Sequence, residues 1–103
     1  MTRTNVGRPE EFPEGMVRGF RVDGADVAVV RRGDEFFAFR NLCTHSAYSF
    51  DRLSLNPDCT ITCVGHFAIF DVKTGEAITG PTSAPLPIYK ASVEDGSVFV
   101  ELG

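Results

Sequence analysis

The sequence predicts an all-β domain, an antiparallel sandwich or barrel built from short strands. Short runs rich in valine, isoleucine and phenylalanine are separated by turn dipeptides that contain glycine, such as Asp23-Gly24 and Asp95-Gly96. No long stretch repeats its apolar residues with the period of an α-helix. The chain has 103 residues, the size of one domain, so we expect residues 1–103 to fold as a single unit.

The first half of the chain predicts a three-stranded meander over residues 16–40. Residues 16–22 alternate apolar with polar or small side chains, residues 27–30 are apolar and mostly valine, and residues 36–39 contain three phenylalanines. Residues 1–15 hold two prolines and clustered charges. We therefore expect an irregular arm before the meander.

The second half predicts two further pairs of strands. Residues 60–62 and 68–72 are apolar and β-branched, and they lie on either side of a short loop. Residues 73–75 contain the next turn. The strands of a final hairpin are expected at 88–93 and 98–102.

Composition limits the possible partners and compartment. The formal net charge is −4, which disfavours nucleic-acid binding and fits docking on a basic partner surface. No apolar run approaches the length of a membrane span, and residues 1–5 lack the apolar core of a signal peptide. Cysteines placed as metal ligands are typical of a reducing compartment. We expect a cytoplasmic protein with no membrane partner.

The most informative segments are Cys43-Thr44-His45 and Cys63-Val64-Gly65-His66. They contain both histidines and two of the three cysteines of the chain, which predicts a metal site. A structural zinc site is one possibility, since zinc accepts two Cys and two His. Zinc fingers, however, pair Cys with Cys and His with His. Each segment here mixes the two types, which favours a binuclear centre.

With the residues that follow, these pairs resemble a Rieske-type ferredoxin over residues 17–102. The matching features, in order, are C-T-H, C-x2-H, Phe70-Asp71, Thr74-Gly75, Gly80-Pro81 and Pro85-Leu86-Pro87. The resemblance implies a Rieske [2Fe–2S] cluster, with Cys43 and Cys63 on one iron and His45 and His66 on the other.

The same resemblance implies the Rieske fold. In that fold a small cluster-binding subdomain, here about residues 41–80, is inserted in the antiparallel base. A proline loop at residues 80–85 would cover the cluster and limit its contact with water.

Departures from the respiratory branch of the family predict a low reduction potential. That branch has two cross-linking cysteines where this chain has Tyr48 and Gly65, and two hydroxyl side chains where this chain has Ala68 and Phe70. Fewer hydrogen bonds to the cluster sulfurs stabilise the reduced state less. We therefore expect a potential near the lower end of the Rieske range.

Two residues beside the ligands need a separate interpretation. The family usually has glycine directly after the second histidine, and this chain has Phe67. Phe67 is either a packing residue or an aromatic part of a docking surface. Cys59 is expected to be a small apolar residue at the start of a strand, not a fifth ligand.

The resemblance implies a one-electron carrier rather than an enzyme. It would receive electrons from a flavin-dependent ferredoxin reductase and pass them to a ring-hydroxylating dioxygenase or a related monooxygenase. Docking is expected near His45 and His66, on a monomer. Alternatives are a zinc-binding interaction module and the Rieske-like small subunit of a nitrite reductase. A catalytic oxygenase is disfavoured, because the chain lacks room for the mononuclear iron domain.

Overall fold

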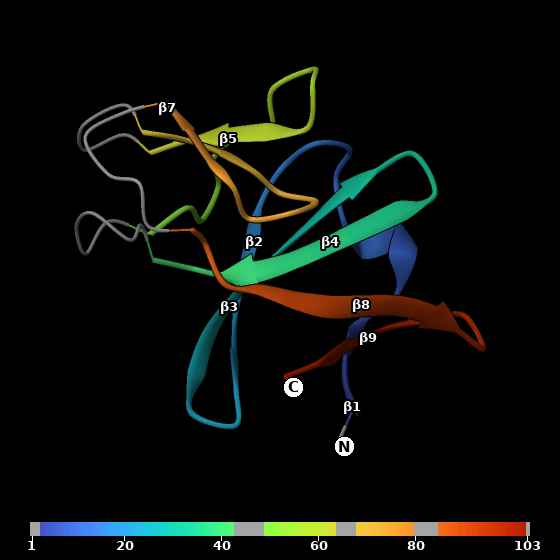
Figure 1. Cartoon of the computed structure of the whole chain (residues 1–103). Coiled ribbons are helices and arrows are strands. Elements are labelled where there is room, and N and C mark those ends of the chain that lie inside the picture. The colour runs from blue at the N-terminus through green and yellow to red at the C-terminus, as the bar shows by residue number, and fades with distance from the viewer. Residues whose placement is uncertain (1–2, 43–48, 64–67, 80–84, 103) are drawn as a thin grey trace.

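The computed structural model describes residues 3–42, 49–63, 68–79 and 85–102. Figure 1 shows a large sheet with a smaller sheet beside it, and the antiparallel all-β prediction is confirmed. The elements are β1 (Arg3–Gly7), the 3-10 helix η1 (Pro9–Glu11), β2 (Arg18–Val22), β3 (Ala25–Arg32), β4 (Glu35–Arg40), β5 (Thr60–Thr62), β6 (Ile69–Asp71), β7 (Ala77–Thr79), β8 (Ile88–Glu94) and β9 (Ser97–Glu101). No helix in these ranges is long and apolar enough to cross a membrane.

The large sheet has six strands in the order β1-β9-β8-β4-β3-β2. The meander β2-β3-β4 and the hairpin β8-β9 are where the sequence predicts them, except that residues 16 and 17 precede β2. Two register pairs, Ala38 with Tyr89 and Phe39 with Ile88, join the meander to the hairpin. The small sheet has the order β5-β6-β7 and spans residues 60–79.

The prediction of an irregular N-terminal arm is wrong for residues 3–7. These residues form β1, which pairs with β9 from Arg3 opposite Glu101 to Gly7 opposite Val98, with a register shift after Asn5. Val6 packs against one of the two cores. The prolines end this strand at η1 instead of excluding a strand from the whole segment.

Strand β3 is buried on both faces because two separate apolar clusters pack against it. Val27 and Val29 belong to one cluster, which also contains Val98 and Val100 of β9. Ala28 and Val30, which point to the opposite face, belong to the other. We call the second group the upper cluster. It continues into the small sheet, and its buried members are Val17, Ala28, Val30, Phe39, Phe50, Leu55, Ile61, Cys63, Ala68, Phe70, Val72 and Leu86.

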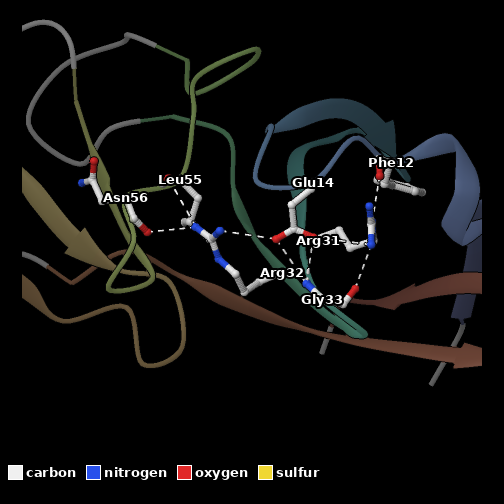
Figure 2. Close-up of polar contacts among 7 residues, drawn as sticks. All are labelled: Phe12, Glu14, Arg31, Arg32, Gly33, Leu55 and Asn56. Atoms are coloured by element: carbon white, nitrogen blue, oxygen red, sulfur yellow. Dashed lines mark hydrogen bonds and ion pairs between the residues drawn. The ribbon is translucent and has the colours of Figure 1, made fainter.

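Polar contacts tie the end of β3 to the segment before the small sheet (Figure 2). The Glu14 carboxylate accepts hydrogen bonds from the backbone N–H of Gly33 at 2.9 Å and from the guanidinium of Arg32 at 3.3 Å, and it pairs with Arg31 at 3.5 Å. Arg32 also donates to the carbonyl oxygen of Asn56 at 3.0 Å. The guanidinium therefore connects the large sheet to the chain that enters β5.

Candidate metal centre

Cys63 is the one predicted ligand that lies among the described residues, and it follows β5 directly. Cys43, His45 and His66 lie outside them. Cys63 is 1% exposed and belongs to the upper cluster. Its backbone N–H donates to the carbonyl oxygen of Ala68 at 2.7 Å, one step beyond the pairing of Thr62 with Ile69. The backbone hydrogen bonds between β5 and β6 therefore continue as far as Cys63 and Ala68, the residues on either side of 64–67.

The segment that carries the first predicted pair, 42–49, is closed at its base in a different way. The side-chain Oδ1 of Asn41 accepts a hydrogen bond from the backbone N–H of Phe50 at 2.8 Å. The backbone N–H of Asn41 donates to the backbone carbonyl oxygen of Asp26, near the start of β3, at 2.9 Å. Asn41 was not singled out from the sequence. The only sequence feature that could have drawn attention to it is its position two residues before the predicted ligand Cys43.

Phe50 connects the bases of the two segments. Its ring packs edge-on against Phe70 of β6, with centroids 6.2 Å apart, and against Phe39 of β4 at 5.7 Å. All three rings are fully buried in the upper cluster, which also contains Cys63. The fold thus brings the base of segment 42–49 and the base of the Cys63 hairpin to one apolar cluster.

The sequence Phe70-Asp71-x-x-Thr74-Gly75 has a structural role after this hairpin. The Asp71 carboxylate accepts from the backbone N–H of Lys73 at 2.8 Å, and the Thr74 hydroxyl accepts from that of Glu76 at 3.2 Å. These contacts form the turn between β6 and β7. The motif therefore shapes the support of the site, and in the described contacts it supplies no additional ligand.

Gly75 is held closely against the segment that follows the predicted proline loop. Its carbonyl oxygen accepts from the backbone N–H of Leu86 at 2.7 Å, and its φ is +82°. A Cβ atom there would overlap the Leu86 carbonyl oxygen and lie 3.0 Å from Cγ1 of Ile88. Only glycine fits this approach, which fixes Leu86 against the turn between β6 and β7.

Two of the positions that set the predicted potential are described. Ala68 and Phe70 are both fully buried, and they present only carbon to the upper cluster. Tyr48, Gly65 and Phe67 lie outside the described residues.

Cys59 lies one residue before β5, with a left-handed φ of +64°, and packs half-buried against the upper cluster. Its backbone N–H donates to Asn56 at 3.0 Å, and its carbonyl accepts from Val72 at 3.1 Å. Within the described ranges no three His, Cys, Asp or Glu side chains gather as a metal site.

The donor set fits a Rieske cluster. Cys63 would contribute a sulfur from an apolar environment, where a thiolate needs the positive charge of a metal to be stable. A buried donor of this kind suits the inner side of an iron–sulfur cluster. The two histidines of the sequence would provide the nitrogen ligands that distinguish a Rieske cluster from an all-cysteine one.

Comparison with known proteins agrees with this assignment. The Rieske [2Fe-2S] domain model matches residues 2–90. The 3-phenylpropionate/cinnamic acid dioxygenase ferredoxin subunit of Escherichia coli (strain K12) is 37% identical over 93 residues, which cover 89% of this chain and 86% of the relative. A structure described as a nitrite reductase small subunit has a TM-score of 0.81 at 17% identity, which establishes a shared fold alone.

Solved ferredoxin structures are also similar. The ferredoxin of carbazole 1,9a-dioxygenase from Nocardioides aromaticivorans IC177 superposes with a TM-score of 0.92 at 32% identity, covering 97% of both chains. A chain from a complex of reduced oxygenase and oxidized ferredoxin in carbazole 1,9a-dioxygenase has a TM-score of 0.86 at 33% identity, with 95% and 100% coverage. With a family model that matches most of its length and relatives above 30% identity, this chain belongs to the Rieske [2Fe-2S] domain family.

Proposed function

We propose that this chain is the ferredoxin of a ring-hydroxylating dioxygenase or related monooxygenase, a one-electron carrier rather than an enzyme. The observation that carries the proposal is that the bases of the two predicted ligand segments meet in one apolar cluster. Their bases are closed by Asn41–Phe50 and Cys63–Ala68 hydrogen bonds and joined through the Phe50 and Phe70 rings. The similarity to dioxygenase ferredoxins over most of the chain supports the same function.

The proposed ligands are Cys43 and Cys63 on one iron and His45 and His66 on the other. When bound, a Rieske cluster accepts and releases one electron. The chain's own residues hold the donors in place and exclude water. The upper cluster surrounds Cys63, and the contact of Gly75 with Leu86 anchors the proline loop that we propose covers the site. We also propose residues 41–80 as the cluster-binding subdomain; the small sheet lies within this range.

We propose a low reduction potential for this carrier. Ala68 and Phe70, at the positions that carry hydroxyl groups in the respiratory branch, are buried carbon side chains here. Without those hydroxyls, fewer donors reach the sulfurs, and the added negative charge of the reduced state is stabilised less.

The proposed partners are a flavin-dependent reductase and a terminal oxygenase, both docking near His45 and His66. One solved relative is a ferredoxin in complex with its oxygenase, which supports the second partner. The formal net charge of −4 favours encounter with basic partner surfaces. We propose a cytoplasmic monomer that binds no nucleic acid and no membrane, since two of its three cysteines are proposed metal ligands, its net charge is negative, and brief docking suits a carrier.

The cluster is tested directly by metal and sulfide analysis. Protein purified without oxygen is expected to be red-brown, to contain equal amounts of iron and acid-labile sulfide, and to give a reduced electron paramagnetic resonance (EPR) spectrum with the low average g value of a Rieske centre. Colourless protein that holds zinc, also after reconstitution with iron and sulfide, would instead establish the zinc module.

The carrier role is tested by reconstitution with the reductase and oxygenase of a 3-phenylpropionate dioxygenase system. Substrate hydroxylation should depend on this chain and saturate with its concentration. The matched control is the same mixture with His66→Ala, which removes a proposed nitrogen ligand. Electron flow from the reductase that is equal with both proteins would contradict the proposal.

A further inference from the structure

Asn41 is one of the few buried polar side chains of the described residues, and its hydrogen bonds bracket a predicted ligand segment. It is 8% exposed and lies directly after β4. Its Oδ1 accepts from Phe50 across nine positions of the chain, while its backbone N–H is bonded to Asp26 of β3. A buried backbone N–H such as that of Phe50 is costly to leave without an acceptor. The amide therefore fixes where residue 50 lies relative to residue 41.

Independent contacts fix the chain directly after Phe50 to β2 and to the residue before it. The backbone N–H of Arg52 donates to Val17 at 2.8 Å, and that of Gly19 donates to the Asp51 carboxylate at 2.8 Å. These bonds hold the chain after Phe50 against the edge of the large sheet. The Asn41 amide then ties this end to the end that follows β4.

Gly19 leaves the space that the Asn41 amide occupies. A Cβ atom at Gly19 would lie 2.7 Å from Nδ2 of Asn41 and 3.3 Å from Cγ of Asp51, closer than such atoms normally approach. Gly19 is not among the glycines with a positive φ, so alanine there meets no backbone strain and acts only by pushing the Asn41 amide from its place. The absence of a side chain at Gly19 therefore permits the observed orientation of the Asn41 amide, although the two residues are distant in the sequence.

We propose that Asn41 is a positioning residue for the cluster. By fixing the separation between the two ends of segment 42–49, it sets how Cys43 and His45 approach Cys63 and His66, and Gly19 preserves its orientation. The inference rests on the proposed cluster ligands. A purely structural Asn41 would contribute stability alone, with no specific effect on the bound cluster.

The test compares Asn41→Ala, Gly19→Ala and the double variant with Val100→Ala, which removes core volume in the other apolar cluster. Far-UV circular dichroism checks folding and urea unfolding measures stability. Two further readouts are the EPR g values of the reduced protein and the rate of cluster loss to an iron chelator without denaturant. Gly19→Ala keeps every hydrogen-bonding group, so it carries the test if Asn41→Ala does not fold.

Asn41→Ala and Gly19→Ala should each lose the cluster about tenfold faster than wild type and shift the g values. Tenfold in rate corresponds to about 1.4 kcal/mol, within the cost of leaving a buried N–H without an acceptor. The double variant should lose the cluster no faster than Asn41→Ala, since truncation of the amide frees the space next to Gly19. Val100→Ala should retain wild-type g values and cluster retention.

The inference is overturned if cluster loss and g values in Asn41→Ala match those of Val100→Ala at equal loss of stability. Rate effects that multiply in the double variant would also overturn it, because the two positions would then act independently. Wild-type protein that never holds iron and sulfide would be a different failure: it would reject the proposed function itself, and this inference with it.

Discussion

Substitution of Gly75 by alanine tests the close contact that anchors the segment after the proline loop. The new Cβ would overlap the Leu86 carbonyl oxygen in a backbone conformation with φ of +82°. Since the overlapping atom belongs to the backbone, rotation of a side chain cannot relieve it. Leu86 must move away from the turn, and its hydrogen bond to Gly75 must lengthen or break.

The expected cost has three parts. A non-glycine residue in the left-handed region costs about 1–2 kcal/mol. Loss of the Leu86 hydrogen bond costs about 1 kcal/mol more. Partial exposure of the Leu86 side chain, now 2% exposed, costs another ~1–2 kcal/mol out of the roughly 1.5–3 kcal/mol of full burial. The total is about 3–5 kcal/mol, a large part of the ~5–15 kcal/mol stability of a typical domain.

Gly96→Ala is the matched control for this experiment. Gly96 has a similar φ of +74°, and nothing lies within 4 Å of its Cβ position. Both variants therefore share the conformational cost, and their difference isolates the contact with Leu86, about 2–3 kcal/mol. At roughly 4 °C per kcal/mol, Gly75→Ala should unfold about 8–12 °C below Gly96→Ala when the two are scanned at one rate.

Equal unfolding temperatures for the two variants would refute this reasoning, because the Leu86 contact would then add nothing to the shared backbone cost. The same samples report on the cluster. If the contact anchors the cover of the site, Gly75→Ala should release iron to a chelator faster than Gly96→Ala at a temperature where both remain folded.

Three further changes have distinct expected results. Phe70→Tyr should raise the midpoint potential by about 40 mV, which is the equivalent of a ~1 kcal/mol hydrogen bond to the reduced cluster. Phe39→Tyr, in the same apolar cluster, should leave the potential unchanged, and equal shifts of the two variants in voltammetry would contradict this prediction. Cys59→Ser should retain full iron and sulfide content, and Cys63→Ser should not; iron loss in the first would make Cys59 part of the site. Arg32→Met should lower the free energy of unfolding by about 1–2 kcal/mol, because two carbonyl oxygens before β5 lose their donor. Since salt screens hydrogen bonds to carbonyls less than ion pairs, most of that loss of stability should persist in about 1 M salt. If the loss disappears in salt, the ion pair of Arg32 with Glu14 is its cause instead.

The meander β2-β3-β4 and the hairpin β8-β9 were predictable because local sequence pattern and burial agree in these strands. Residues 27–30 are apolar without interruption, and the structure explains why: β3 is covered on both faces. The hairpin β8-β9 was predictable from its Asp95-Gly96 turn, in which both residues adopt a positive φ.

Two strands were not predictable, because long-range pairing stabilises them. β1 contains polar and charged residues, and its partner β9 lies at the other end of the sequence. The sequence around β7 predicts only the turn before it, yet residues 77–79 complete the small sheet by pairing with β6. In both cases the partner strand, and not local propensity, decides the structure.

The kind of cofactor was predictable because cysteine and histidine are rare residue types that occur in this sequence at short spacing, whereas the supports of the site were not. Asn41, Gly19 and Leu86 are common residues that act through contacts across the fold. No spacing rule connects Gly19 to Asn41. Only the three-dimensional arrangement shows that the glycine and the amide share one space.

The pairing of the first described strand with the last has a practical consequence for measurement. Arg3 and Glu101 face each other in register, and Figure 1 shows both ends of the described chain on the side of the molecule away from β5 and β7. A fusion partner or a surface linker attached beyond either strand would leave the small sheet turned outward. Immobilisation on an electrode through either end would therefore attach the molecule on the side away from β5 and β7 and leave the small sheet facing the solution.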